Sequence, residues 1–136
     1  MLIPPYQYQF QSLLIDNDIF DCGDVGVNSV ELIVTDVNGN TAFCTSLVTV
    51  VDTIVPVAIC QDVTVTLDGS GNATPSAGNV NNGSSDACGI ASIALNDTTF
   101  TCADVPNQTV TLTVTDNNGN SATCTATITV NDTTPP

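Results

Sequence analysis

Short stretches of alternating apolar and polar residues recur along the chain, which is the pattern of half-buried β-strands. Residues 63–67, 110–114 and 122–130 interleave apolar side chains with threonine. Branched side chains of this kind favour strands over helices. The segments between the strands are rich in glycine, asparagine and aspartate, and the Asn-Gly pair within 116–120 is typical of a β-hairpin. The pattern predicts an all-β fold built from immunoglobulin-like β-sandwiches.

The chain repeats itself with a constant offset of 80 positions. Residues 20–22 (Phe-Asp-Cys) correspond to 100–102 (Phe-Thr-Cys), and residues 35–40 correspond to 115–120. Such self-similarity indicates tandem domains. We predict a partial or altered immunoglobulin-like repeat over 1–52, a linker over 53–56, a complete repeat over 57–133, and the start of the next linker over 134–136.

The first repeat has no counterpart of the opening strand that lies within 57–67. An incomplete sandwich leaves a sheet edge and an open core. We therefore expect another chain, or further sequence, to complete it. A strand donated by a neighbour is one physical solution.

The charge balance of the chain excludes several classes of function. There are 14 acidic side chains and no Lys, Arg or His, so the net charge is −14. A chain without basic residues cannot neutralise a nucleic-acid backbone, form a lysine Schiff base or build a triad on an imidazole. No apolar run is long enough for a membrane span, so we expect no membrane insertion. Acidic pairs suited to glycoside hydrolysis are not distinguished from surface charge, and we predict that the protein is not an enzyme.

Six cysteines could pair in 15 ways. If both repeats share one fold, Cys22–Cys44 and Cys102–Cys124 are equivalent pairs, which leaves Cys60–Cys88. Each bridge would stabilise the fold by about 3 kcal/mol through loop closure. Without a Cys-x-x-Cys motif or a histidine, zinc or iron–sulfur ligation is disfavoured. Disulfides indicate an oxidising compartment, so we predict an extracellular or cell-surface location.

Three segments carry a resemblance to a known family: 58–65 (Ala-Ile-Cys-Gln-Asp-Val-Thr-Val), 82–90 (Asn-Gly-Ser-Ser-Asp-Ala-Cys-Gly-Ile) and 113–120 (Thr-Val-Thr-Asp-Asn-Asn-Gly-Asn). They resemble hyalin-type (HYR-like) repeats, as found in very long surface adhesins of gliding bacteria that the type IX secretion system exports. The resemblance covers 57–133 well, 12–56 as a partial unit, and 1–11 not at all. It implies strings of immunoglobulin-like domains, and adhesion or filament building rather than catalysis.

Two loops place oxygen-bearing side chains at alternate positions, the spacing with which short loops bind Ca²⁺. An ordinary hairpin turn is the alternative explanation of the same residues. We expect that the second loop, with Asp52, could form a calcium site between the domains, and that Asp132 could meet the first loop of a following repeat. The loop residues are Asp36, Asn38 and Asn40, and Asp116, Asn118 and Asn120.

Thr53, Thr98 and Thr133 follow aspartate in a pattern that resembles the O-glycosylation signal of the same bacterial group. The sequence as a whole predicts a structural segment of an extracellular filament or adhesin, whose partners are tandem neighbours or copies joined head to tail. The alternative is a glycan- or surface-binding module of a larger secreted protein. That alternative rests on Tyr6, Tyr8 and Phe10, and the chain has no tryptophan to stack on a sugar ring.

Overall fold

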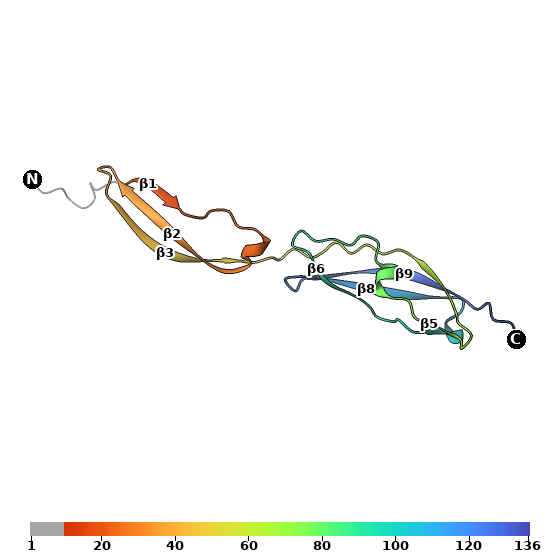
Figure 1. Ribbon diagram of the computed structural model, residues 1–136. Coiled ribbons are helices and arrows are strands. Elements are labelled where there is room, and N and C mark those ends of the chain that lie inside the picture. Colours follow the sequence, from red (N-terminus) through yellow and green to blue (C-terminus); the bar gives the residue numbers. More distant parts are fainter. Residues whose placement is uncertain (1–9) are drawn as a thin grey trace, which may run out of the picture. The chain divides into compact units, whose positions relative to one another are not determined.

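The alternating stretches form β-strands in the computed structural model, which describes residues 10–136 (Figure 1). The chain divides into two compact units, Met1–Asp52 and Thr53–Pro136. Both units are built from β-sheet with very little helix, so the predicted all-β, immunoglobulin-like class is confirmed.

The first unit is one antiparallel sheet with the strand order β1–β2–β3. The strands are β1 (Phe10–Ile15), β2 (Gly26–Asp36) and β3 (Thr41–Val50). A single 3-10 turn, η2 (Cys22–Asp24), precedes β2. Asp21 caps this turn, because its carboxylate accepts a hydrogen bond from the Gly23 N–H at 2.8 Å.

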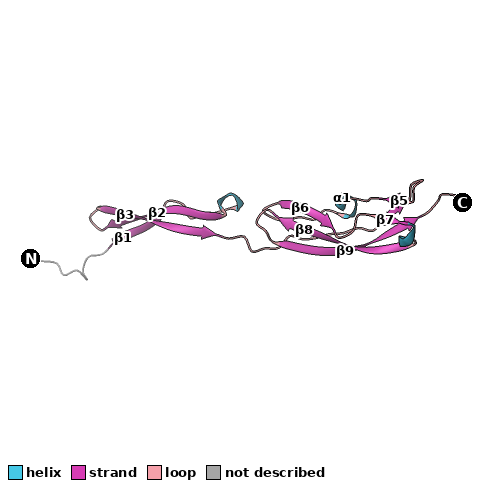
Figure 2. Cartoon of the chain, turned by 90° about the horizontal axis from the view of Figure 1, so that it is seen from below, coloured by secondary structure: helices cyan, strands magenta, loops and turns pink. Residues whose placement is uncertain are grey.

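The second unit contains a four-stranded sheet with the order β4–β9–β8–β6 and a two-stranded sheet, β5–β7. Strand β4 runs parallel to β9, whereas the other pairs are antiparallel. Figure 2 shows these strands with the short helix of the unit. The elements are β4 (Val63–Thr66), β5 (Asn72–Ala73), α1 (Ala77–Val80), β6 (Ile90–Leu95), β7 (Phe100–Thr101), η3 (Cys102–Asp104), β8 (Asn107–Asp116) and β9 (Ser121–Asn131).

The core of the second unit lies on one face of its larger sheet. Alternate residues of β8 and β9 point to the same face, and these are the buried ones. Phe100 from β7 and Val80 from α1 have no exposed surface and cover that face. The core residues are Leu67, Val80, Phe100, Val110, Leu112, Val114, Ala126, Ile128 and Val130.

The sheet of the first unit is a copy of three strands of the second. Strands β1, β2 and β3 correspond to β6, β8 and β9 at the same offset of 80 residues. Phe10 pairs with Asp36 as Ile90 pairs with Asp116, and both pairs are followed by the same one-residue bulge. The described part of the first unit contains no counterpart of β4, β5 or α1. The expectation of an incomplete first sandwich is therefore confirmed.

The predicted disulfide pairs are wrong. Cys60 is bonded to Cys124, with their Cα atoms 5.9 Å apart, which excludes both Cys60–Cys88 and Cys102–Cys124. Cys44 is a free, exposed cysteine, which excludes Cys22–Cys44, and Cys102 is also free. Cys22 and Cys88 are disulfide-bonded cysteines.

The geometry of the strands explains this correction. Gly26 pairs with Val50, so the turn that carries Cys22 lies at the Val50 end of β3. Cys44 is six residues away along that strand, or about 20 Å at about 3.4 Å per residue. Disulfide-bonded Cα atoms are rarely more than about 7 Å apart. Cys60 instead precedes β4, which runs parallel to β9, and the parallel pairing brings it level with Cys124.

Candidate functional site

The open side of the first unit is its most distinctive surface. The residues that correspond to the core of the second unit include Val30, Leu32 and Val48, and of these Val30 alone is buried. Leu13 and Ile15 on β1 occupy corresponding positions and are 52% and 40% exposed. The face that forms a core in the second unit is therefore accessible in the first.

Strand β3 is also an edge strand. Within the described residues it pairs with β2 alone, whereas its counterpart β9 lies between β8 and β4. An edge strand presents unpaired backbone N–H and C=O groups that can bind a further strand. Cys44 lies on β3 with an exposed thiol, and its counterpart Cys124 carries a disulfide.

The opposite face of the same sheet carries a second apolar feature. Leu14 pairs with Ile33, and Ile33 pairs with Phe43, so three large apolar residues form a row across all three strands. Leu14 is 60% and Phe43 is 70% exposed. The corresponding row in the second unit consists of Ala94, Thr113 and Thr123. On this face the first unit therefore exposes large apolar side chains where the second unit has alanine and threonine.

The predicted calcium loop of the first unit forms a closed hairpin turn between β2 and β3. The Asp36 carboxylate accepts hydrogen bonds from the backbone N–H groups of Asn38 and Asn40 at 2.8 and 2.9 Å. Its other oxygen accepts one from the Asn40 side-chain amide at 2.9 Å. This amide, with the backbone N–H groups, holds the pKa of Asp36 below its ordinary value. Gly39 adopts the positive φ of 85° that the turn requires.

The loop of the second unit has the same geometry. Asp116 accepts hydrogen bonds from the N–H groups of Asn118 and Asn120 at 2.8 Å and from the Asn120 amide at 2.9 Å. Asp116 is 1% exposed. Burial by itself would raise the pKa of this carboxyl, but the hydrogen bonds from Asn120, Asn118 and Gly119 outweigh it and lower the pKa.

A third loop, over residues 68–72, repeats this arrangement without the middle asparagine. Asp68 accepts hydrogen bonds from the N–H groups of Ser70 and Asn72 at 2.8 and 3.0 Å. All three loops share the pattern Asp-x-x-Gly-Asn. The hydrogen bonds within each loop account for its shape as a turn. Calcium binding there, including the interdomain site with Asp52 and the site with Asp132, stays a prediction.

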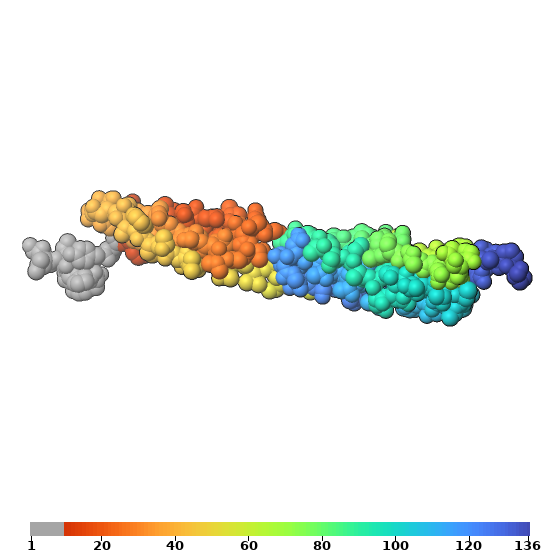
Figure 3. Space-filling model, turned by 60° about the horizontal axis from the view of Figure 1, so that its bottom comes forward, coloured from red at the N-terminus to blue at the C-terminus, as the bar shows by residue number. Residues whose placement is uncertain are grey.

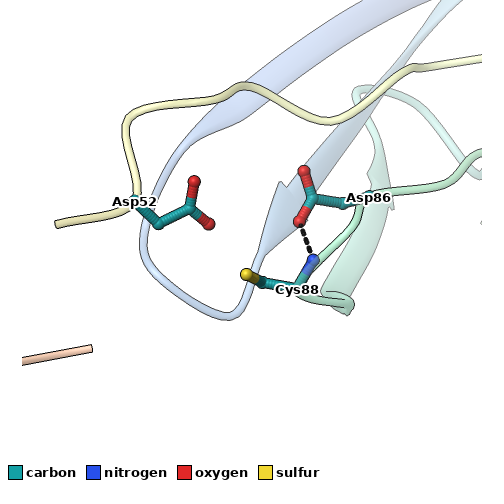
Figure 4. A group of neighbouring side chains, drawn as sticks. All are labelled: Asp52, Asp86 and Cys88. Atoms are coloured by element: carbon teal, nitrogen blue, oxygen red, sulfur yellow. Dashed lines mark hydrogen bonds between the residues drawn. The ribbon is translucent and has the colours of Figure 1, made fainter. Parts of the chain in front are cut away.

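The second loop is tied to a neighbouring turn of its own unit. The Asn117 side chain donates a hydrogen bond to the Cys88 carbonyl at 2.8 Å, and its N–H donates to the Gly89 carbonyl at 3.1 Å. The Asp86 carboxylate accepts from the Cys88 N–H at 2.8 Å (Figure 4). Because Cys88 is disulfide-bonded, its sulfur is not available as a thiolate ligand for a metal.

A shallow pocket of about 380 Å³ lies at the C-terminal end of the second unit. In Figure 3 the yellow-green turn around Asp68 lies beside the dark blue C-terminal segment. The free Cys102 lines this pocket with Asp132 and Thr134. A Cβ at Gly71 would lie 3.1 Å from the Cys102 sulfur, so the glycine permits this close approach. No aromatic residue lines the pocket, so it offers no ring for sugar stacking.

The remaining predicted sites are on the surface. Thr53, Thr98 and Thr133 are all exposed, and their glycosylation stays a prediction. Of the aromatic residues suggested for glycan binding, Phe10 is 60% exposed on β1. Tyr6 and Tyr8 lie outside the described residues.

Sequence reasoning missed strand β1 and the free thiol of Cys44. The signal for β1 was present, because Asp16 and Asn96 are 80 positions apart and play the same part. Asp16 accepts the Glu31 N–H at 2.7 Å, and Asn96 accepts the Thr111 N–H at 2.9 Å. No such local signal identifies Cys44 as free, because its state depends on a further strand beside β3, and residues 10–136 supply none there.

Comparisons with known proteins give structural likeness at low identity. No protein-family model matches the chain, and no curated protein matches it in sequence. The structure is similar to protocadherin gamma B7 extracellular cadherin domains 1–4, at 17% identity and a TM-score of 0.41 over 93% of this chain and 41% of that one. It is also similar to PcdhgB3 EC1–4, at 14% identity and a TM-score of 0.43 over 92% and 41% of the two chains. The chain thus spans about two fifths of the length of these structures. Among the residues from 10 onward, no helix has the length and apolar character needed to cross a bilayer.

Proposed function

We propose that this chain is a segment of an extracellular filament or adhesin, built from disulfide-bonded immunoglobulin-like repeats that join head to tail. The observation that carries this proposal is the open first unit. It copies three strands of a complete sandwich, and it leaves the face that should be a core accessible. Contiguous apolar surface of this kind marks an interaction site.

The chemistry of the chain supports a structural role. Cys60 and Cys124, 64 positions apart, form a disulfide. Disulfides are a feature of proteins that work in oxidising compartments outside the cell. The absence of Lys, Arg and His removes the usual general bases and phosphate-binding groups. Fourteen acidic side chains keep such a chain soluble through mutual repulsion.

Electron microscopy of the purified chain tests the proposal. We expect end-to-end fibres, and their loosening in a calcium chelator would support calcium at the junctions. Fibres that are unchanged by the chelator would support the structural role and would show that the Asp-x-x-Gly-Asn loops act only as turns. Dispersed particles with and without calcium would overturn self-assembly.

A pair of variants on β3 shows whether fibres use the open face. Val48 lies on that face and is half-buried, whereas its neighbour Thr49 is exposed and points to the other side. Val48→Asp should abolish fibres because it places a charge where a partner must pack. Thr49→Asp should leave them intact. Equal fibre formation by both variants would show that the open face is not the junction.

A further inference from the structure

The second unit shows which kind of strand fits the open edge of the first. There β9 pairs on one side with β8 and on the other with β4, which runs parallel to it. The parallel pairing extends from Val63 opposite Ile128 to Thr66 opposite Asn131. At the offset of 80 residues, the corresponding edge of the first unit is residues 48–51 of β3 and its continuation.

We propose that this edge of β3 binds a parallel strand of the 57–67 type, supplied by a repeat in a neighbouring polypeptide, and that a disulfide at Cys44 holds it in place. The proposal deepens the proposed function, on which it rests, because it names the segment that joins one repeat to the next. In this chain residues 63–66 are paired with β9 and Cys60 is bonded to Cys124, so a neighbouring copy supplies the strand only by releasing it from its own second unit.

Backbone groups on the edge support the parallel arrangement. In the second unit, the Thr127 N–H donates to the Asp62 carboxylate at 2.9 Å, and the Leu67 N–H donates to the Asn131 carbonyl at 2.9 Å. The corresponding groups of the first unit are the N–H of Leu47 and the carbonyl of Val51. An incoming strand of the same type therefore meets a donor and an acceptor at matching positions.

The side chains of such a strand also match the open face. Val63 and Val65 alternate along β4 and pack against the core of the second unit. Placed against β3, the same alternation covers the half-buried Val48 and Val50. Segment 57–67 has one acidic residue, Asp62, which binds a backbone N–H rather than facing another carboxylate. The docked strand thus adds little repulsion to an acidic protein.

The free thiol provides an independent observation. Cys44 corresponds to Cys124, whose partner Cys60 lies three residues before β4. A docked strand of the 57–67 type therefore brings its own cysteine level with Cys44. The bond forms by thiol–disulfide exchange: the Cys44 thiolate attacks the incoming cysteine, which carries a small-molecule mixed disulfide, and the small thiolate leaves.

A peptide with the sequence of residues 57–67 tests the proposal on the full chain. Its cysteine is activated as a mixed disulfide with 5-thio-2-nitrobenzoate, so each exchange releases a coloured thiolate. The control peptide keeps the cysteine in place and scrambles the other residues. Cys102→Ser leaves Cys44 as the free thiol, and Cys44→Ser leaves Cys102, the other free exposed cysteine of the chain.

We expect the matching peptide to react with Cys44 at least tenfold faster than the scrambled one, and with Cys102 at the same rate as the scrambled one. Amide hydrogen exchange should slow at least tenfold at Leu47 and Thr49 after the matching peptide has bound. Equal rates for both peptides at Cys44, or unchanged exchange along β3, would overturn the proposal. If the peptide fails while electron microscopy shows fibres, the filament role stands and joins through another surface. If the peptide docks but no fibres form, the edge site stands and the filament role fails.

Discussion

The pairing of Cys60 with Cys124 makes a quantitative prediction for extension under force. The bond closes a loop of 64 residues, which an unfolded but oxidised unit cannot extend. Cutting it should release about 220 Å of chain, since an extended residue spans about 3.4 Å. The measurement is single-molecule pulling through handles at the two termini, with and without a thiol reductant. The background is Cys22→Ala with Cys88→Ala, so that no other bonded cysteine limits the extension.

The size of the increment decides between the alternative pairings. A bond between Cys102 and Cys124, which the repeat by itself suggests, closes 22 positions and would release about 75 Å. Replacing the free cysteines Cys44 and Cys102 by serine should leave the larger increment unchanged. An increment near 75 Å, or none, would refute the parallel arrangement that brings Cys60 level with Cys124.

Three further predictions concern the second unit. Phe100→Ala should cost about 3–5 kcal/mol in urea unfolding followed by circular dichroism, because the ring is fully buried, whereas Phe43→Ala should cost under about 0.5 kcal/mol; similar losses would contradict the assigned core. The lowered pKa of Asp116 means that its contribution to stability is present above the ordinary value of 3.8 and is lost as the pH falls through the folded-state pKa. Thermal melts between pH 5 and 2 should show this loss, and Asp116→Asn should flatten it. Gly83→Ala should cost about 1–2 kcal/mol for its positive φ. Gly89→Ala should cost more, because its Cβ would also meet a side-chain amide at 2.6 Å, and an equal cost in chemical denaturation would argue against that contact.

Local patterns of the sequence predicted much of the fold. Alternation with threonine located the strands that became β4, β8 and β9, and the Asn-Gly pairs located both hairpins. These features depend on residues close together in the chain, where side-chain period and turn chemistry decide the conformation. The offset of 80 residues also predicted the incomplete first unit, because a missing strand is visible as a missing segment.

The disulfide pattern and the free thiol of Cys44 depend on the pairing of strands that are distant in the sequence, and the sequence did not predict them. Cys60 meets Cys124 because β4 lies parallel to β9, an arrangement that no local pattern specifies. The repeat suggested that equivalent cysteines pair within each unit, but the partner of Cys124 has no equivalent in the first unit. The sequence located the candidate calcium loops correctly as turns. It did not predict the hydrogen bonds that the carboxylates of Asp36 and Asp116 accept within these turns.

The three Asp-x-x-Gly-Asn turns have a consequence for the response of the protein to salt. Their carboxylates are held by amide N–H groups rather than by basic side chains, since the chain has none. Raising the ionic strength therefore weakens no attraction between oppositely charged side chains, and it screens the repulsion among fourteen like charges. Among the charged side chains, salt therefore only weakens repulsion, and we expect the free energy of unfolding to rise with ionic strength.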